Sequence, residues 1–151
     1  MHETEALHIR RLTAEDLEPL HRLLSDPAVM RYLEPPFTRA QTEAFLQKAG
    51  MGREPLIRAV EDGRGFAGYV IYHPYDETSM EMWWVLASDR WGRGYALALT
   101  RQMICRARES GRDAVIECHP QQAATRHIAE KLGFRPCGMD GGCCVYRLAG
   151  K

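Results

Sequence analysis

The order of strand-like and helix-like segments in the second half of the chain constrains its fold most. Apolar runs at 80–86, 114–119, 134–139 and 143–148 predict strands, the last two as a hairpin, and the segments 95–109 and 120–132 have helical spacing. Parallel neighbouring strands need a crossover of about a dozen residues or more, usually a helix. The two strand–helix–strand successions therefore predict parallel pairing in this half of the sheet.

The first half predicts a strand, two helices and an antiparallel meander. Residues 6–12 fit a first strand, and capping signatures at Thr13 and Thr38 open two helices. The second helix is expected to bury Ala44, Phe45 and Ala49. The runs 56–60 and 66–73 are joined by a short loop that contains Asp-Gly, which is typical of a hairpin. Three consecutive strands favour antiparallel pairing. We therefore expect one domain over residues 1–151, of the α/β class (an α+β mixed sheet), with about seven strands in a twisted sheet and helices on both faces.

Composition narrows the class of partner. Lys plus Arg and Asp plus Glu number 20 each, so the formal net charge is zero and a nucleic-acid partner is not expected. No apolar run approaches a membrane span. The five cysteines are odd in number, lack C-x-x-C spacing and follow no signal peptide, which favours a cytoplasmic protein with buried free thiols. Their spacing with His119 matches no familiar zinc pattern, so no metal site is expected.

The turn between the predicted strand 80–86 and helix 95–109 is the strongest functional signal. Its sequence is Arg90-Trp91-Gly92-Arg93-Gly94-Tyr95-Ala96. Two glycines allow a tight turn and a close approach of ligand to backbone. The free N–H groups at a helix start bind anions, and arginines add charge-assisted contacts. The turn lacks the Walker pattern and the third small residue of a dinucleotide fingerprint. A tight connection without a ligand is the alternative.

The segment Trp91-Gly92-Arg93-Gly94-Tyr95-Ala96 resembles the pyrophosphate loop of the GNAT acetyltransferases, whose pattern is [Gln/Arg]-x-x-Gly-x-[Gly/Ala]. Trp at the first position resembles the branch that acetylates ribosomal-protein N-termini. Three further segments resemble that branch, so the resemblance covers essentially the whole chain: Ile9-Arg10-Arg11-Leu12-Thr13, the stretch from Asp26-Pro27 to Leu33, and Glu130-Lys131-Leu132-Gly133-Phe134. The resemblance implies a bacterial, acetyl-CoA-dependent N-acetyltransferase that moves acetyl directly from the thioester to a primary amine.

The resemblance also implies where acetyl-CoA would bind. The strand before the loop would pair with the pantetheine amides and splay from the next strand, which leaves a slot for the thioester. The family's Asn-x-x-Ser spacing is replaced by Gln122 and Thr125. The implied cofactor-binding residues are Trp84, Val85, Leu86, Arg90, Trp91, Gly92, Arg93, Gly94, Tyr95, Ala96, Gln122, Thr125 and Lys131.

Aminolysis of a thioester needs a neutral amine, a stabilised oxyanion and a protonated leaving thiolate. Near pH 7.4 a lysine amine is only about 0.1% neutral and an α-amine roughly 30%, so a base matters more for the first. Glu81 resembles a family glutamate that takes the amine proton, with an edge salt bridge as the alternative. A family tyrosine that serves as the acid is replaced by Ala129. Thr125 and His119 are then the candidates for protonating the thiolate. The alternative for His119 is a structural residue at the end of its strand, hydrogen-bonded locally.

The acceptor amine is the least determined part of the prediction. Met30, Tyr32, Glu34 and Trp83 are the expected substrate-binding residues. Ribosomal-protein N-termini, other peptides and small-molecule amines all fit the chemistry. An exposed last strand would allow a homodimer. Two rival readings are a non-catalytic acyl-CoA-binding or regulatory module and an interaction domain in which the turn is merely tight.

Overall fold

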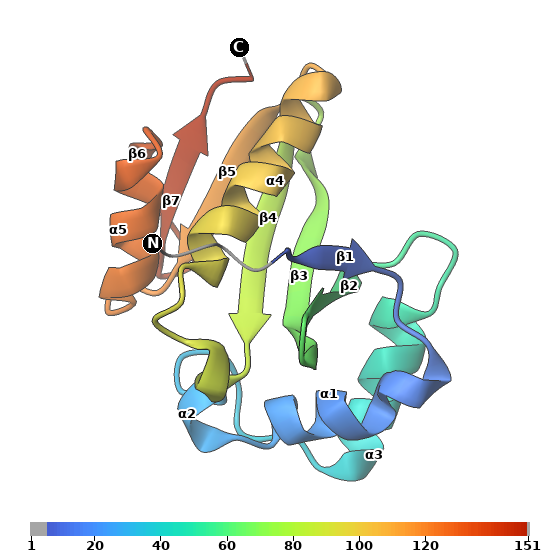
Figure 1. Cartoon of the computed structure of the whole chain (residues 1–151). Helices are drawn as coiled ribbons and strands as arrows, with labels where there is room; N and C mark the ends of the chain where they lie inside the picture. Colours follow the sequence, from blue (N-terminus) through green and yellow to red (C-terminus); the bar gives the residue numbers. More distant parts are fainter. Residues whose placement is uncertain (1–5, 151) are drawn as a thin grey trace. The chain divides into compact units, whose positions relative to one another are not determined.

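The computed structural model describes residues 6–150 and arranges its strands in one mixed sheet (Figure 1). The strand order is β1-β2-β3-β4-β5-β7-β6. β4 and β5 pair in parallel through the crossover helix α4, and the pairs β1–β2, β2–β3, β5–β7 and β6–β7 are antiparallel. The predicted mixed sheet of seven strands is confirmed. Of the two predicted parallel pairings, that of β4 with β5 is confirmed and that of β5 with β6 is wrong, because β7 lies between them. The strands are β1 His8–Arg10, β2 Ile57–Asp62, β3 Gly65–Asp76, β4 Ser79–Leu86, β5 Asp113–Cys118, β6 Arg135–Asp140 and β7 Cys143–Leu148.

The helices begin where the capping residues place them. Thr38 accepts a hydrogen bond from the N–H of Gln41 at 3.1 Å, and the Gln41 side chain accepts from the N–H of Thr38 at 2.8 Å, which is the predicted capping box. Asp26 caps a short helix that starts at Pro27, a position where the missing N–H costs no helical hydrogen bond. The helices are α1 Leu17–Leu24, α2 Pro27–Met30, α3 Arg39–Phe45, α4 Tyr95–Glu109 and α5 Ala123–Lys131, with a π turn at Leu46–Gly50 after α3.

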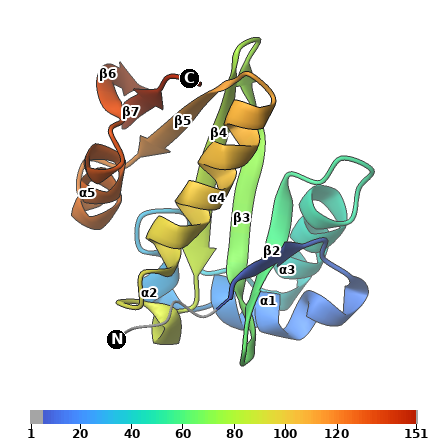
Figure 2. The ribbon, with the colours of Figure 1, turned by 45° about the horizontal axis from the view of Figure 1, so that its top comes forward.

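The contacts divide the described chain into two compact units. The first comprises residues 6–71 and Trp84–Tyr95, and the second comprises Tyr72–Trp83 and residues 96–150. In the first unit α1 and α3 lie side by side (Figure 2). Leu20 of α1 is fully buried in that unit. Burial of a leucine side chain contributes roughly 1.5–3 kcal/mol.

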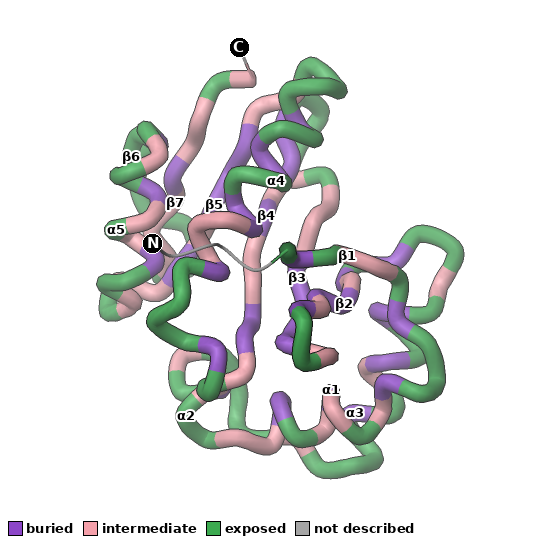
Figure 3. The backbone as a smooth tube through the Cα atoms, in the orientation of Figure 1, coloured by how far each residue is buried: buried purple, intermediate pink, exposed green. Residues whose placement is uncertain are grey.

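In the second unit one face of α4 is buried. Leu99, Met103 and Ala107 recur every four residues and are at most 3% exposed, which is the pattern of an amphipathic helix (Figure 3). Val115 and Ile116, neighbours on β5, are both fully buried. A strand with both faces covered needs this continuous apolar sequence.

Three expectations from the sequence are wrong in detail. Ala44 of α3 was expected to be buried but is exposed, while Thr42 is fully buried. Of the cysteines, Cys118 alone is buried in the described residues. The last strand, β7, is not an edge strand, because β6 lies outside it. β6 contains Pro136, and proline is tolerated at an edge because no neighbour needs its missing N–H.

Candidate functional site

Both ends of the predicted phosphate loop are fixed by one buried carboxylate in the first unit. The Asp62 side chain, at the end of β2, is fully buried and accepts two hydrogen bonds from the Arg90 guanidinium, at 3.0 and 3.2 Å. The Tyr95 hydroxyl, at the start of α4, donates to the same carboxylate at 2.7 Å. The hydrogen bond from Arg90, then that from Tyr95, holds the pKa of Asp62 far below its usual value despite burial.

This geometry gives Arg90 a role different from the one expected. Arg90 is 8% exposed, and its guanidinium also donates to Asp89 at 3.1 Å. With two carboxylates as partners, it serves to position the loop. The charge available for a phosphate in this turn is that of Arg93, which is exposed.

The backbone of the loop explains its two glycines. Gly92 and Gly94 have φ of 77° and 81°, in the left-handed region that side chains disfavour. No heavy atom lies within 4 Å of the position that a Cβ would take at either residue, so the requirement is conformational. The Trp91 indole donates to the Leu86 carbonyl at 3.0 Å, yet the residue is 51% exposed. The loop is thus fixed by its flanks and open along Gly92 and Gly94.

A third glycine brings the end of β4 against β3. A Cβ on Gly68 would lie 2.1 Å from the Val85 carbonyl oxygen and 2.9 Å from the Leu86 Cα. The backbone N–H of Ala87 donates to the Ala67 carbonyl at 2.9 Å just beyond this contact. Val85 and Leu86 are buried, whereas Trp84 is half-buried. Gly68 was not identified from the sequence, although a glycine inside a strand often marks such a close approach.

In the second unit β4 and β5 pair over only part of their length. The register runs from Ser79 opposite Asp113 to Glu81 opposite Val115, while both strands continue beyond. Pairing therefore ends at Glu81, within this unit. The paired end is held by Arg147, which donates to Asp113 at 2.9 Å and to Asp76 at 3.1 Å.

Glu81, the candidate base, lies at the last paired position and has a partner that the sequence did not reveal. Its carboxylate is 2.9 Å from Nε2 of His73 on β3, with side-chain exposures of 22% and 36%. A carboxylate accepts, so His73 donates from Nε2 in this contact. The pair is half-buried, which keeps Glu81 oriented and still reachable.

A second carboxylate lies just beyond the same point, on β5. Glu117 accepts a hydrogen bond from the Tyr75 hydroxyl at 3.3 Å. Burial, then the charge of Glu81 and contact with Asp140, raises the pKa of Glu117 above its usual value. Burial, followed by the charge of Glu117, also raises the pKa of Cys143. The cluster of His73, Tyr75, Glu81 and Glu117 therefore contains two carboxyl groups, and the charge of Glu81 disfavours ionisation of Glu117.

The turn from β5 into α5 contains the other predicted catalytic and cofactor residues. The N–H of Gln121 donates to Nδ1 of His119 at 3.0 Å, which places the His119 ring proton on Nε2. The Gln122 side chain accepts from the His119 N–H at 2.9 Å, so its carbonyl is used within the turn. Thr125 is 7% exposed. Lys131 is exposed at the end of α5.

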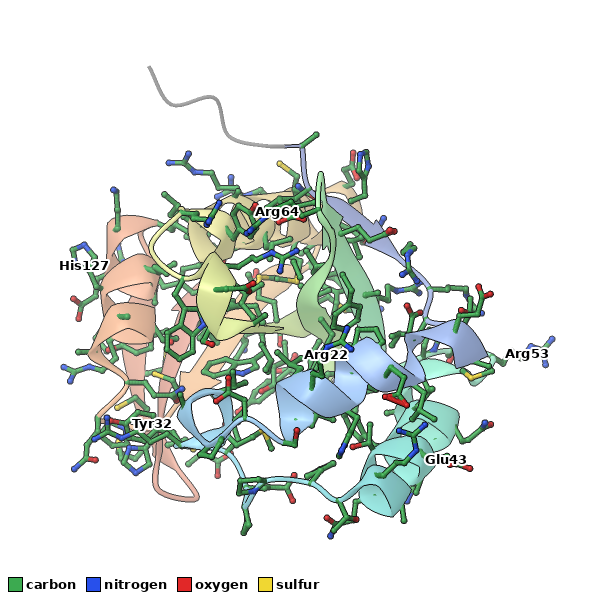
Figure 4. The ribbon with its side chains drawn as sticks, turned by 60° about the horizontal axis from the view of Figure 1, so that its bottom comes forward. Arg22, Tyr32, Glu43, Arg53, Arg64 and His127 are labelled. Atoms are coloured by element: carbon green, nitrogen blue, oxygen red, sulfur yellow. The ribbon has the colours of Figure 1, made fainter. Side chains whose placement is uncertain are left out.

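Figure 4 shows His127 on the outer side of α5, away from the strands of its unit. The residue is exposed. It has no assigned part in the site.

The predicted acceptor residues differ in their surroundings. Met30 is 4% exposed and belongs to the core of the first unit, so we withdraw it as a substrate contact. Tyr32 is half-buried, with the Arg31 guanidinium 5.1 Å from its ring centroid. Glu34 is exposed, and Trp83, in the second unit, is half-buried.

Neither a metal site nor a membrane-spanning helix is found among the described residues. Within residues 6–150, no three His, Cys, Asp or Glu side chains come together as a metal site would need. Over the same residues, every helix is too short or too polar to cross a membrane.

Solved structures with this fold include acetyltransferases. A GNAT-family acetyltransferase from Bacillus anthracis aligns with a TM-score of 0.83 at 24% identity, over 98% of this chain and 97% of that one. The spermidine N-acetyltransferase of Vibrio cholerae, solved with CoA and spermine, aligns with a TM-score of 0.75 at 22% identity, over 94% of this chain and 93% of that one. At these identities the likeness defines the fold.

Sequence similarity defines the family. The family model described as an acetyltransferase (GNAT) domain matches residues 6–135. The uncharacterized N-acetyltransferase YnaD of Bacillus subtilis is 26% identical over 145 residues, which cover 93% of this chain and 85% of that protein. The chain belongs to the GNAT acetyltransferase family, which implies acetyl-CoA-dependent N-acetylation.

Proposed function

We propose that this protein transfers acetyl directly from acetyl-CoA to a primary amine, either a peptide N-terminus or a small-molecule amine. The observation that carries the proposal is the loop at residues 91–96, open along its glycines and fixed at both ends by Asp62. The resemblance to the branch that acetylates ribosomal-protein N-termini makes peptide N-termini the first acceptors to test. We also propose a cytoplasmic location, from the free thiols.

The residues present fit a CoA ligand. Gly92 and Gly94 leave the backbone accessible, Arg93 adds an exposed positive charge, and the first N–H groups of a helix lack partners within that helix. We assign Trp84, Val85 and Leu86 to the pantetheine arm through their backbone. Gln122 and Thr125 are assigned to the arm as well, and Trp91, Tyr95, Ala96 and Lys131 to the phosphate and nucleotide end. Bound acetyl-CoA supplies an activated acyl group as a thioester.

We assign the proton transfers of this reaction to residues of the chain itself. Glu81 takes a proton from the acceptor ammonium, and His73 holds the Glu81 carboxylate in place by donating from Nε2. Glu117 adds a second carboxyl group on β5, and its raised pKa means that it holds a proton more readily than an ordinary glutamate. Thr125 and His119 remain the candidates for protonating the leaving group, with the His119 proton on Nε2.

A panel of amines tests the proposal. The purified protein is supplied with acetyl-CoA and with peptides, amino acids, polyamines or aminoglycosides, and the release of free CoA thiol is measured. Release with at least one acceptor is the expected result. Binding of acetyl-CoA without release on any amine would instead indicate a non-catalytic module, a reading favoured by Ala129 at the position of the family tyrosine.

The role of Glu81 is tested through the pH dependence of kcat. Glu81→Gln should lower kcat by about 10²–10⁴-fold at neutral pH, the usual worth of a general base, and by less at high pH, where the acceptor is already neutral. Glu77→Gln, in the exposed turn before β4, is the matched control and should retain activity. A pH profile of Glu81→Gln that runs parallel to that of the wild type would remove Glu81 from the mechanism.

A further inference from the structure

Two cysteines face each other across neighbouring strands of the second unit. The antiparallel register of β5 and β7 places Cys118 directly opposite Cys144. Residues paired in this way are about 4.5 or 5.5 Å apart between Cα atoms, depending on the pair type. Disulfides form at Cα separations of roughly 4.4–6.8 Å, so either pair type is within range. Opposite residues also direct their side chains to the same face of the sheet.

The two thiols differ in access to solvent. Cys118 is 2% exposed, and burial, followed by the proximity of Cys144, raises its pKa to about 11. Cys144 is half-buried. A small oxidant therefore reaches Cys144 first, and Cys118 is held beside it as the second thiol. Cys143, the next residue along β7, points to the opposite face and serves as an internal comparison.

We propose that Cys118 and Cys144 form a redox modification site that a peroxide converts into a disulfide bond. The peroxide transfers one oxygen to the Cys144 sulfur, which gives a sulfenic acid and water. The Cys118 sulfur then attacks this sulfur, the S–S bond forms and the S–O bond breaks, and a second water leaves. Overall the two thiols lose two electrons and two protons, and the peroxide is reduced to two waters.

The bond would close a loop that contains part of the proposed acetyl-CoA site. Residues 119–143 include α5 and β6, and with them Gln122, Thr125 and Lys131. Closing a loop of this length restricts the unfolded chain, and we expect the melting temperature to rise by roughly 5–10 °C. Because the register alone carries the argument, this proposal does not depend on the proposed function.

The experiment uses the whole reduced protein, which is treated with hydrogen peroxide, then unfolded in denaturant and alkylated. Trypsin cleaves after Arg112, Arg126, Lys131 and Arg147 but not before Pro136, so the expected product is peptide 113–126 linked to peptide 132–147. A reductant should restore both free peptides. The second peptide holds three cysteines, so the variant Cys143→Ser should keep the link and Cys144→Ser should lose it.

Thermal unfolding of the same samples supplies a second readout. Oxidation should raise the melting temperature of the wild type and of Cys143→Ser, and leave that of Cys144→Ser unchanged. If Cys144→Ser fails to fold, Cys144→Ala is used in the same way. The proposal is overturned if peroxide fully oxidises the exposed Cys105 while Cys118 stays alkylatable, or if the link runs to another cysteine.

Discussion

Removing the charge of Asp62 should destabilise the protein more than removing the Asp89 carboxylate or the Tyr95 hydroxyl. Asp62→Asn keeps the shape of the side chain but leaves the buried Arg90 guanidinium, whose side chain is 9% exposed, without its main counter-charge. Breaking a buried ion pair from one side costs about 3–5 kcal/mol. The exposed Asp89 still accepts from Arg90 at 3.1 Å, so we expect the lower end, about 3 kcal/mol. Since whole domains are stable by only about 5–15 kcal/mol, urea unfolding will resolve this loss easily.

Two further variants make the measurement specific. Asp89→Asn removes the other carboxylate of the same arginine, but the Asp89 side chain is 63% exposed, and a surface pair contributes about 1 kcal/mol or less. Tyr95→Phe removes only the hydroxyl bond to Asp62, worth about 1.5–3 kcal/mol for a charged acceptor. The predicted order of destabilisation is Asp62→Asn, then Tyr95→Phe, then Asp89→Asn. An Asp62→Asn variant as stable as Asp89→Asn would refute the idea that this carboxylate fixes the loop.

Three other outcomes follow from the same contacts. The pKa of Asp62 is lower in the folded state than in the unfolded state, where it is about 3.9. Its contribution to the free energy of unfolding is therefore complete above about pH 5 and is lost as the pH falls toward the folded pKa. The unfolding free energy of Asp62→Asn should change less between pH 5 and pH 2 than that of the wild type. Gly68→Ala places a Cβ 2.1 Å from the Val85 oxygen, so its melting temperature should fall by several degrees, whereas Gly63→Ala, with open space around it, should change little. His73→Gln should lower kcat less than Glu81→Gln does and alter its pH dependence, because His73 only orients the base; a loss as large as that of Glu81→Gln would contradict the positioning role.

The loop and its helix were predictable because their signals are local. α4 begins at Tyr95 and ends at Glu109, as the sequence predicted, since two glycines precede an apolar pattern of helical period. The hairpin formed by β2 and β3 turns at Gly63 and Arg64, as the Asp-Gly signal indicated. Local sequence signals are enough to indicate such elements, because local preferences in natural sequences agree with the global fold.

The contacts that hold the loop in place were not predictable, because the residues that make them are distant in sequence. Asp62 and Arg90 are 28 residues apart, and Asp62 and Tyr95 are 33 apart. The local sequence shows only an arginine beside a glycine-rich turn, and Arg90 was therefore predicted to bind phosphate. The pairing of His73 with Glu81 likewise depends on how β3 lies beside β4.

The buried face of α3 was predicted incorrectly for a different reason. Apolar residues indicated that Ala44 was internal, yet the buried position is Thr42. Its hydroxyl bonds to the Thr38 carbonyl at 3.0 Å and lies 3.1 Å from Nδ1 of His21 on α1. A polar side chain with satisfied hydrogen bonds can be buried at little cost, and residue type alone does not reveal those partners.

The central claim is that the glycine-rich loop binds the phosphate end of acetyl-CoA. Calorimetric titration of the protein with CoA and with pantetheine, which lacks the phosphates and adenosine, tests it directly. We expect CoA to bind at least about tenfold more tightly than pantetheine, a difference of about 1.4 kcal/mol, and Arg93→Ala to remove most of that difference while Arg101→Ala, exposed on α4, does not. Equal affinities for the two ligands, or no binding of CoA, would contradict the account.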